Sequence, residues 1–417
     1  MSEIDRICAY RIMIIATLVV ISGASTSCGI TPISPSETSS ATVVTASRPM
    51  TSTPMGMRTV TATPTKQPTA SPTETPFTTT IHVPAQVTAT QTPTSVGQGD
   101  IIYFEVSSGI WKVDPADGAN KELLYTDDLC KDLPRLSPDG WWIAYYASEC
   151  GQLDSGSLWL LDIRQKVAWP VNAPVRQVDA NWLPDNKLLY TEYPSFVFDP
   201  YGDAPPDFGT DYRTFVYDPV RKTPKQIPAL PFLMTYRVYA ISPTEERIAA
   251  VKEGEQDLLV SNFSGGQAKE LIKDYSMHTF VWSPDGKSLA YDQGGRRQEI
   301  FVIDVDSGRV HQVTHRGEER SIILRSWSPD GKWIAFDQNW QICVVAVQDG
   351  EEKCFDIRPP GLMEYPIAWS PDSSTIVQTH RSSQGDTWDL YLIRLVDGTI
   401  TRLTYDENYE YYVLWRQ

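Results

Sequence analysis

The 417-residue chain carries 52 Asp and Glu residues against 36 Lys and Arg, a formal net charge of −16, and 41% of its residues are hydrophobic. So acidic a chain lacks the basic patch that neutralises nucleic-acid phosphates, and adhesion to an anionic lipid surface is disfavoured for the same reason. The composition is also uneven along the chain. All 13 Trp lie between Trp111 and Trp415, whereas residues 31–97 contain none. We therefore expect an ordered C-terminal domain, which we call the body, preceded by an N-terminal region of different composition.

The first 28 residues contain the parts of a secretory signal. Arg6 and Arg11 precede an apolar run at residues 12–21, and small residues lead from there to Cys28. The run is shorter than the roughly 20 apolar residues that a membrane-spanning helix needs. Small residues before a Cys resemble a bacterial lipoprotein signal, which implies lipidation of Cys28 and an extracytoplasmic, membrane-anchored protein. Ser25 departs from that family's aliphatic preference, so an ordinary signal peptide or an uncleaved anchor stays an alternative.

Residues 29–97 have the composition of a stalk. The stretch 31–97 holds twenty Thr and ten Pro. Such a segment cannot bury enough apolar surface to offset the entropy of ordering. Pro stiffens it, and Ser/Thr-rich stretches with Pro are typical of O-glycosylated stalks. We expect a disordered spacer that holds the body, residues 98–417, away from a membrane.

A turn motif recurs along the body. In its fullest form it reads Ser-Pro-Asp-Gly, a type I turn sequence. Its six prolines are 41 to 59 residues apart: Pro138, Pro184, Pro243, Pro284, Pro329 and Pro371. Strand-forming residues follow each turn, then a second β run, an Asp- or Gly-containing hairpin turn and a short last strand. Four strands per unit of this length predict a blade of an all-β propeller.

The two ends of the body complete one blade. Residues 101–106, 109–114 and 121–126 supply its last three strands, and residues 411–417 supply its first strand. Together with six whole units, this predicts seven four-stranded blades, closed by N- and C-terminal strands that share one sheet. The longer third unit, residues 181–239, leaves six or eight blades as alternatives.

The segments Trp282–Ala290 and Trp327–Ala335 share the pattern Trp-Ser-Pro-Asp-Gly-Lys. The pattern resembles the WD40-like propeller repeat of the TolB family and of prolyl oligopeptidase-type peptidases. This resemblance covers residues 101–417 and implies a propeller fold. The TolB protein carries an α/β domain before a six-bladed ring, whereas a stalk precedes an apparent seven blades here. The peptidases add an α/β-hydrolase domain, whose G-x-S-x-G elbow is missing from this sequence.

The four cysteines of the body predict two disulfides. An even number of cysteines in an exported protein favours disulfide pairing. Cys130 is expected in a loop entering a blade and Cys150 at the end of that blade's second strand, while Cys343 and Cys354 lie on the two strands of one hairpin. We therefore predict the pairs 130–150 and 343–354. Because no C-x-x-C pair and no His cluster accompanies them, a metal site is the weaker interpretation.

No catalytic, metal or cofactor constellation emerges from the residue spacing. His311 and His315 flank a strand end, and we interpret them as surface polar residues. The recurrent Asp of the turn motif is explained by turn chemistry. The tryptophans of the first strands are expected in the cores between blades. These are Trp182, Trp282, Trp327, Trp369 and Trp415.

The loops after second and fourth strands share the face opposite the Ser-Pro-Asp turns. We call it the loop face, and the opposite one the turn face. Tyr, Trp and Arg on loops are typical of interaction surfaces, and the stretch 193–212 is both aromatic and acidic. Ordinary loop composition is the alternative interpretation. The candidate binding residues are Tyr201, Tyr212, Arg296, Arg297, Arg320, Trp340, Arg381, Trp388 and Tyr409.

The sequence favours a non-catalytic binding or scaffolding module for a protein, peptide or cell-wall ligand. It implies no cofactor and no nucleic-acid partner, and contact with a membrane only through the N-terminal anchor. Two alternatives stay open: a propeller enzyme, such as a glycosidase or lyase with acidic residues at the central axis, or the accessory propeller of a separately encoded hydrolase.

Lipidation is tested by metabolic labelling with a fatty acid. Wild type should incorporate the label and Cys28→Ala should not, because the thiol of Cys28 is the expected attachment point. Cys8→Ala is the matched control and should label like wild type. Label retained by Cys28→Ala would contradict the lipoprotein hypothesis.

Overall fold

The computed structural model describes the chain from residue 99 to residue 416, with gaps. The described ranges are 99–105, 109–118, 120–150, 155–194, 211–227, 236–245, 247–252, 257–263, 268–273, 279–294, 297–317, 321–338, 341–356, 367–381, 388–405 and 410–416. The expected signal, Cys28 and the expected stalk lie outside these ranges and stay predictions. Within them, no helix is long and apolar enough to cross a membrane.

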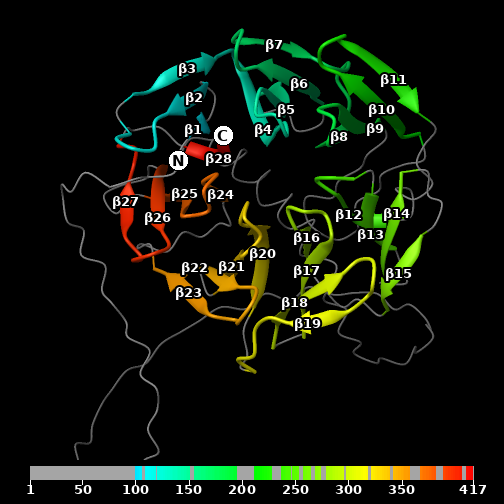
Figure 1. Ribbon diagram of the computed structural model, residues 1–417. Helices are drawn as coiled ribbons and strands as arrows, with labels where there is room; N and C mark the ends of the chain where they lie inside the picture. The colour runs from blue at the N-terminus through cyan, green and yellow to red at the C-terminus, as the bar shows by residue number, and fades with distance from the viewer. Residues whose placement is uncertain are drawn as a thin grey trace, which may run out of the picture. The chain divides into compact units, whose positions relative to one another are not determined.

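The described strands form seven antiparallel sheets of four strands each, arranged as a β-propeller (Figure 1). We number the sheets as blades 1 to 7 and give their strands from first to fourth. Blade 1 comprises β28 (Glu410–Arg416), β1 (Asp100–Glu105), β2 (Ile110–Val113) and β3 (Glu122–Tyr125). Blade 2 comprises β4 (Leu129–Leu136), β5 (Trp142–Glu149), β6 (Ser157–Asp162) and β7 (Val167–Pro170). Blade 3 comprises β8 (Gln177–Trp182), β9 (Leu188–Tyr193), β10 (Arg213–Asp218) and β11 (Thr223–Ile227).

The other four blades follow in chain order. Blade 4 comprises β12 (Tyr236–Ile241), β13 (Arg247–Lys252), β14 (Leu258–Asn262) and β15 (Lys269–Ile272). Blade 5 comprises β16 (Phe280–Trp282), β17 (Ser288–Gln293), β18 (Glu299–Asp304) and β19 (Val310–Gln312). Blade 6 comprises β20 (Ile322–Trp327), β21 (Trp333–Gln338), β22 (Gln341–Ala346) and β23 (Glu352–Phe355). Blade 7 comprises β24 (Ile367–Trp369), β25 (Thr375–Arg381), β26 (Trp388–Arg394) and β27 (Ile400–Arg402).

The predicted seven-bladed all-β propeller is therefore confirmed, and six or eight blades are excluded. Blade 1 is the split blade: C-terminal β28 pairs antiparallel with N-terminal β1, with Ile101 opposite Trp415 and Tyr103 opposite Val413. The long third unit forms one four-stranded sheet from its described residues. Its extra length does not add a blade.

The Ser-Pro-Asp-Gly turn is held by a repeated hydrogen-bond pattern. In blade 6, the Ser328 hydroxyl donates to Asp330 Oδ1 at 2.7 Å and accepts from the Trp333 backbone N–H at 3.0 Å. The Gly331 N–H donates to the Ser328 carbonyl at 2.9 Å, and Gly331 adopts a φ of 71°, which favours glycine. The serines of blades 2, 5 and 7 donate in the same way to their turn aspartates. The motif therefore recurs because it satisfies the polar groups of a tight turn.

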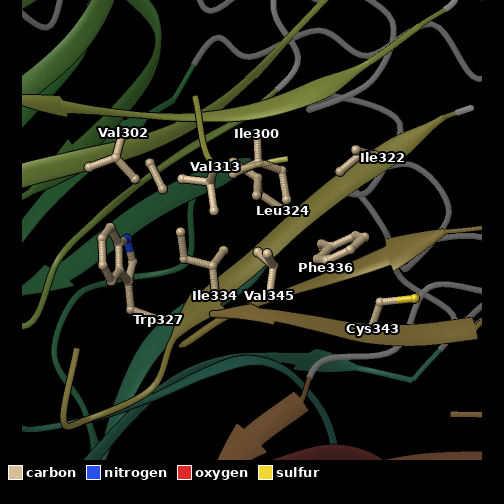
Figure 2. Packing of buried hydrophobic residues seen from close by; sticks show 11 residues of the cluster. Ile300, Val302, Val313, Ile322, Leu324, Trp327, Ile334, Phe336, Cys343 and Val345 are labelled. Carbon is tan, nitrogen blue, oxygen red and sulfur yellow. The ribbon is translucent and has the colours of Figure 1, made fainter. Parts of the chain in front are cut away.

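Each blade buries its faces against its two neighbours. Seven apolar clusters lie in the described core, and each joins residues of adjacent blades. In the cluster between blades 5 and 6, Ile300 of β18 packs with Ile334 and Phe336 of β21 (Figure 2). The cores thus run around the whole ring, including the interfaces on both sides of the split blade.

The first-strand tryptophans link neighbouring blades, as predicted. The indole N–H of Trp282 donates to the Ala240 carbonyl at 3.0 Å, and that of Trp327 donates to the Val281 carbonyl at 3.1 Å. Each acceptor lies on the first strand of the preceding blade. Each of these indoles therefore adds a directional contact to the apolar core.

Both predicted disulfides are present. Cys130 and Cys150 are bonded with their Cα atoms 5.0 Å apart, and Cys343 and Cys354 are bonded at 4.0 Å. Cys343 and Cys354 are direct register partners on β22 and β23. Cys130 lies within strand β4 and not in a loop, because its blade's first strand begins earlier than expected.

Ser328→Ala tests the turn chemistry. The substitution leaves a strand N–H and a carboxylate oxygen without their hydroxyl partner, so we expect the free energy of unfolding to fall by about 1–3 kcal/mol in urea titrations. Ser307→Ala is the matched control: Ser307 also donates to a turn aspartate on the turn face, but it is exposed. An equal loss in both variants would contradict this account.

Candidate functional site

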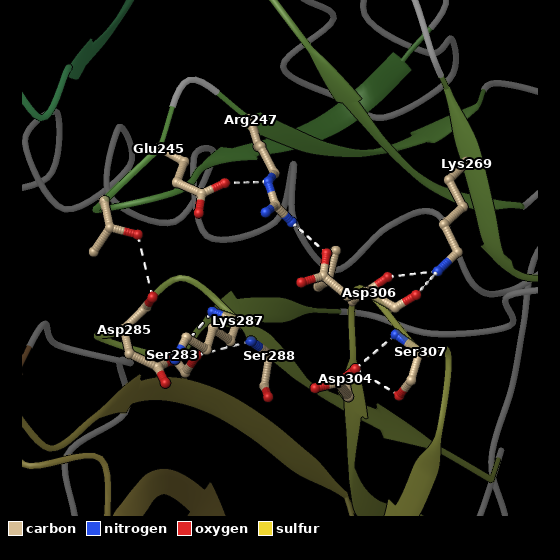
Figure 3. Close-up of polar contacts among 12 residues, drawn as sticks. Glu245, Arg247, Lys269, Ser283, Asp285, Lys287, Ser288, Asp304, Asp306 and Ser307 are labelled. Carbon is tan, nitrogen blue, oxygen red and sulfur yellow. Dashed lines mark hydrogen bonds and ion pairs between the residues drawn. The ribbon is translucent and has the colours of Figure 1, made fainter.

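The turn face is occupied by contacts that join blades. Between blades 4 and 5, Arg247 Nη1 lies 3.0 Å from Asp306 Oδ1, and Lys269 Nζ donates to the Asp306 carbonyl at 2.6 Å (Figure 3). The Thr244 hydroxyl donates to the Asp285 carbonyl at 3.2 Å. Polar groups used in this way hold the ring together. The loop face and the inner edge of the ring are therefore the better candidates for ligand contact.

The structure describes four of the candidate loop-face residues. Tyr212 is half-buried, and its ring centroid lies 6.3 Å from that of Tyr193. Arg297 is exposed before β18, and Trp388 is half-buried at the start of β26. Arg381 ends β25, and its side chain is outside the description. These residues belong to blades 3, 5 and 7, which are not neighbours, so they do not form one cluster.

The other candidate loop-face residues lie outside the described residues. They are Tyr201, Arg296, Arg320, Trp340 and Tyr409. Their part in binding stays a prediction.

The histidine pair fits the surface interpretation. His311 and His315 are exposed, and His311 Nε2 lies 3.2 Å from the Val347 carbonyl of the next blade. Within the described ranges, no group of three or more His, Cys, Asp or Glu is placed to hold a metal ion.

The inner edge of the ring is accessible to solvent at blades 2 and 3. First strands β4 and β8 carry mostly half-buried side chains, whereas second strands β5 and β9 are almost completely buried. First strands lie toward the centre of the ring (Figure 1). Polar side chains at this edge are therefore available to a ligand that enters the axis.

Asp179 and Arg135 form the most distinctive polar group at this edge. Asp179 of β8 is half-buried, whereas Arg135 of β4 is exposed and interacts electrostatically with it. Burial raises the pKa of Asp179, although Arg135 and hydrogen bonds with Gln177 and Tyr193 oppose the shift. A side chain that keeps solvent contact and yet has a pKa raised by burial lies in a recess.

Sequence reasoning missed this pair, although a signal was present. The polar residues Gln177, Asp179 and Asn181 stand at every second position of β8. A search for apolar residues alone would have assigned this first strand to the core. The alternation marks polar side chains on one side of an inner strand. Tyr193, which interacts with Asp179, is the first residue of the aromatic and acidic stretch 193–212. The recess and that stretch are thus joined at Tyr193.

The comparisons with known proteins show the fold. No protein-family model matches the chain, and no curated protein matches its sequence. Among solved structures, the chain is similar to a prolyl endopeptidase with a TM-score of 0.52 and 12% identity, over 76% of this chain and 49% of that one. It is also similar to an oligogalacturonate lyase in complex with manganese, with a TM-score of 0.50 and 16% identity. The match covers 69% of this chain and 83% of the lyase chain. For TolB from Acinetobacter baumannii the TM-score is 0.45 and the identity is 14%. The match covers 76% of this chain and 66% of the TolB chain.

The two structures with TM-scores of 0.50 and 0.52 support the propeller fold. The chain spans about half the length of the prolyl endopeptidase and just under two thirds of that TolB chain. At such low identities the likeness concerns the fold alone. The chemistry of the chain has to be argued from its own residues.

The titration of Asp179 tests the recess. Because burial dominates there, Asp179 should titrate above the ordinary value of 3.8, whereas the hydrogen bond from the Ser283 hydroxyl lowers the pKa of Asp285. Carboxyl ¹³C chemical shifts measured against pH report both groups in one sample, and Asp179→Asn assigns the first. Titration of Asp179 at or below the value for Asp285 would contradict the recess.

Proposed function

We propose that this chain is an exported β-propeller that binds a protein, peptide or cell-envelope ligand without catalysis, through the loop face and the inner edge of blades 2 and 3. The observation that carries the proposal is the electrostatic interaction of exposed Arg135 with half-buried Asp179, which also hydrogen-bonds with Tyr193. Directed polar groups in a recess on a rigid scaffold favour recognition of a specific ligand.

The chemistry of the recess indicates the ligand's polar groups. Arg135 presents a planar set of N–H donors, which suits a carboxylate. Asp179 offers carboxyl oxygens that accept hydrogen bonds from a neighbouring amide or hydroxyl. A peptide with a free carboxylate meets both requirements, and an acidic polysaccharide meets them as well.

The proposed location has two supports. The pairs 130–150 and 343–354 are disulfides, which persist in oxidising compartments outside the cytoplasm. The N-terminal signal pattern is the second support. We further propose that lipidated Cys28 anchors the protein and that residues 29–97 act as the tether.

The enzyme alternative also has specific support. An acid with a raised pKa beside an arginine at a propeller axis suits general acid–base catalysis. One structure of similar fold is an oligogalacturonate lyase. Turnover of acidic oligosaccharides by wild type that is abolished in Asp179→Asn would favour this alternative over binding alone. The accessory-propeller alternative would be favoured by co-purification of a hydrolase.

Ligand retention by the full mature chain tests the binding proposal. Envelope components captured by wild type should be retained about 10- to 100-fold more weakly by Arg135→Gln, because charge-assisted hydrogen bonds contribute about 1.5–3 kcal/mol. Deletion of residues 194–211 should weaken retention too. Arg164→Gln is the matched control, since Arg164 is an exposed arginine whose guanidinium lies 5.1 Å from the Trp141 ring on the turn face.

Unchanged retention of every component by both Arg135→Gln and the deletion variant would contradict the proposal. An equal loss of retention in Arg135→Gln and Arg164→Gln would show that ligands are held by non-specific charge attraction and not by the proposed site.

A further inference from the structure

The strand pair that closes the ring contains two buried carboxyl groups opposite each other. Glu105 of β1 and Glu410 of β28 are register partners at the loop-face end of the pair. Glu105 is 6% exposed and Glu410 is 0% exposed. The register shifts between Phe104 and Glu105, and Glu105 interacts electrostatically with Glu410. Like charges opposite each other oppose strand pairing. Two ionised carboxylates at this position would therefore push the closing strands apart.

Blade 7 adds a third buried carboxyl group. Asp389 of β26 is 0% exposed and interacts electrostatically with Glu410. The Thr404 hydroxyl donates to Glu410 Oε2 at 2.7 Å, while Glu410 Oε1 has no hydrogen-bond partner within the described part of the chain. The Tyr103 hydroxyl of β1 is likewise buried without such a partner there, and its pKa is raised by burial and by Glu410.

Two cations face this cluster. Arg402 Nη2 of β27 lies 2.9 Å from Asp389 Oδ2. Lys121, just before β3, lies with its Nζ 5.3 Å from the Tyr103 ring centroid and interacts electrostatically with Glu410. His380 of β25 is buried opposite Asp389 in the strand register. Glu410 is 0% exposed, and its Oε1 is unsatisfied within the described residues. An ionised carboxylate buried in this way is costly, so one carboxyl group of the cluster keeps its proton.

Glu410 is the group that holds this proton. Burial is the main cause that raises its pKa to about 8, and the charges of Asp389 and Glu105 add to the effect, against Thr404 and Lys121. Burial also raises the pKa of Asp389, but the ion pair with Arg402 opposes that shift and stabilises the ionised form of Asp389.

We propose that this propeller is closed by a proton latch, in which loss of the proton held at Glu410 reversibly opens the β1–β28 pair. These two strands come from opposite ends of the ring and no turn joins them, unlike the first and second strands of the other blades. Opening therefore breaks the strand pairing, the packing of β28 and its side-chain contacts, such as the hydrogen bond from the Tyr412 hydroxyl to Asp132, but no turn has to rearrange. It exposes Glu410, which then ionises in water.

The sign of the pH dependence follows from linkage. Closed, Glu410 has a pKa of about 8; open, it returns toward the ordinary 4.5. Between these values opening releases one proton, so the opening constant rises about tenfold per pH unit. The stabilisation by the latch is complete below about pH 4.5 and decreases as pH rises. Above about pH 8 the opening constant no longer changes with pH.

Amide hydrogen exchange on the full mature chain tests the latch. After correction for intrinsic exchange chemistry, the opening constant of β1 and β28 amides should rise about a hundredfold from pH 5.5 to 7.5. Amides of β17 and β18 in blade 5 are the internal reference and should change far less. Glu410→Gln, which stays neutral, should abolish the rise, and Glu105→Gln should reduce it.

Glu299→Gln is the matched control. Glu299 is a buried glutamate that also accepts a hydrogen bond from a threonine hydroxyl, that of Thr314, but its register partner is Gln293 and not a carboxyl group. This variant should keep the wild-type pH response at β1 and β28.

Three results would each overturn the proposal. The first is protection of β1 and β28 that does not change between the two pH values. The second is a full pH response in Glu410→Gln, or in Glu105→Gln if Glu410→Gln does not fold. The third is an equal response in all blades, which would show global unfolding instead of a local latch.

Discussion

The structure depends on the burial of each blade against its two neighbours. A four-stranded sheet with two apolar faces is stable only when both faces are covered, and here every cover is another blade. The seven clusters therefore form one continuous system, to which each blade contributes on both sides. Removing one interface would expose two faces at once. The β1–β28 pairing is what completes this circle.

The fold was predictable because its signals are local and repeated. The Ser-Pro-Asp-Gly turn, the strand that follows it and the tryptophan before it each have a direct physical reason, and the six occurrences of the turn motif remove the ambiguity of any single one. The disulfides followed from the same topology, since Cys343 and Cys354 had to face each other across one hairpin. The position of Cys130 within β4 was missed because strand ends carry weak signals.

The candidate site was much less predictable, for a different reason. Loop composition singled out residues such as Tyr212, Arg297 and Trp388, which the fold distributes over separate blades. The recess instead depends on Arg135 and Asp179, which lie on strands of different blades and interact electrostatically only when the ring forms. The same holds for Glu105 and Glu410, which are over 300 residues apart in sequence and opposite in register. Long-range pairs of this kind leave no spacing pattern to detect.

The split blade also determines how the ring carries mechanical load. The chain enters the ring at Asp100, which pairs with Arg416, and the Arg416 guanidinium lies 4.8 Å from the Trp141 ring on the turn face. Tension on the segment before β1 is therefore applied at the turn-face end of that strand, opposite the loop face. Pulling along β1 against a ligand held on the loop face loads its pairings with β2 and β28 in shear, so that many hydrogen bonds resist together.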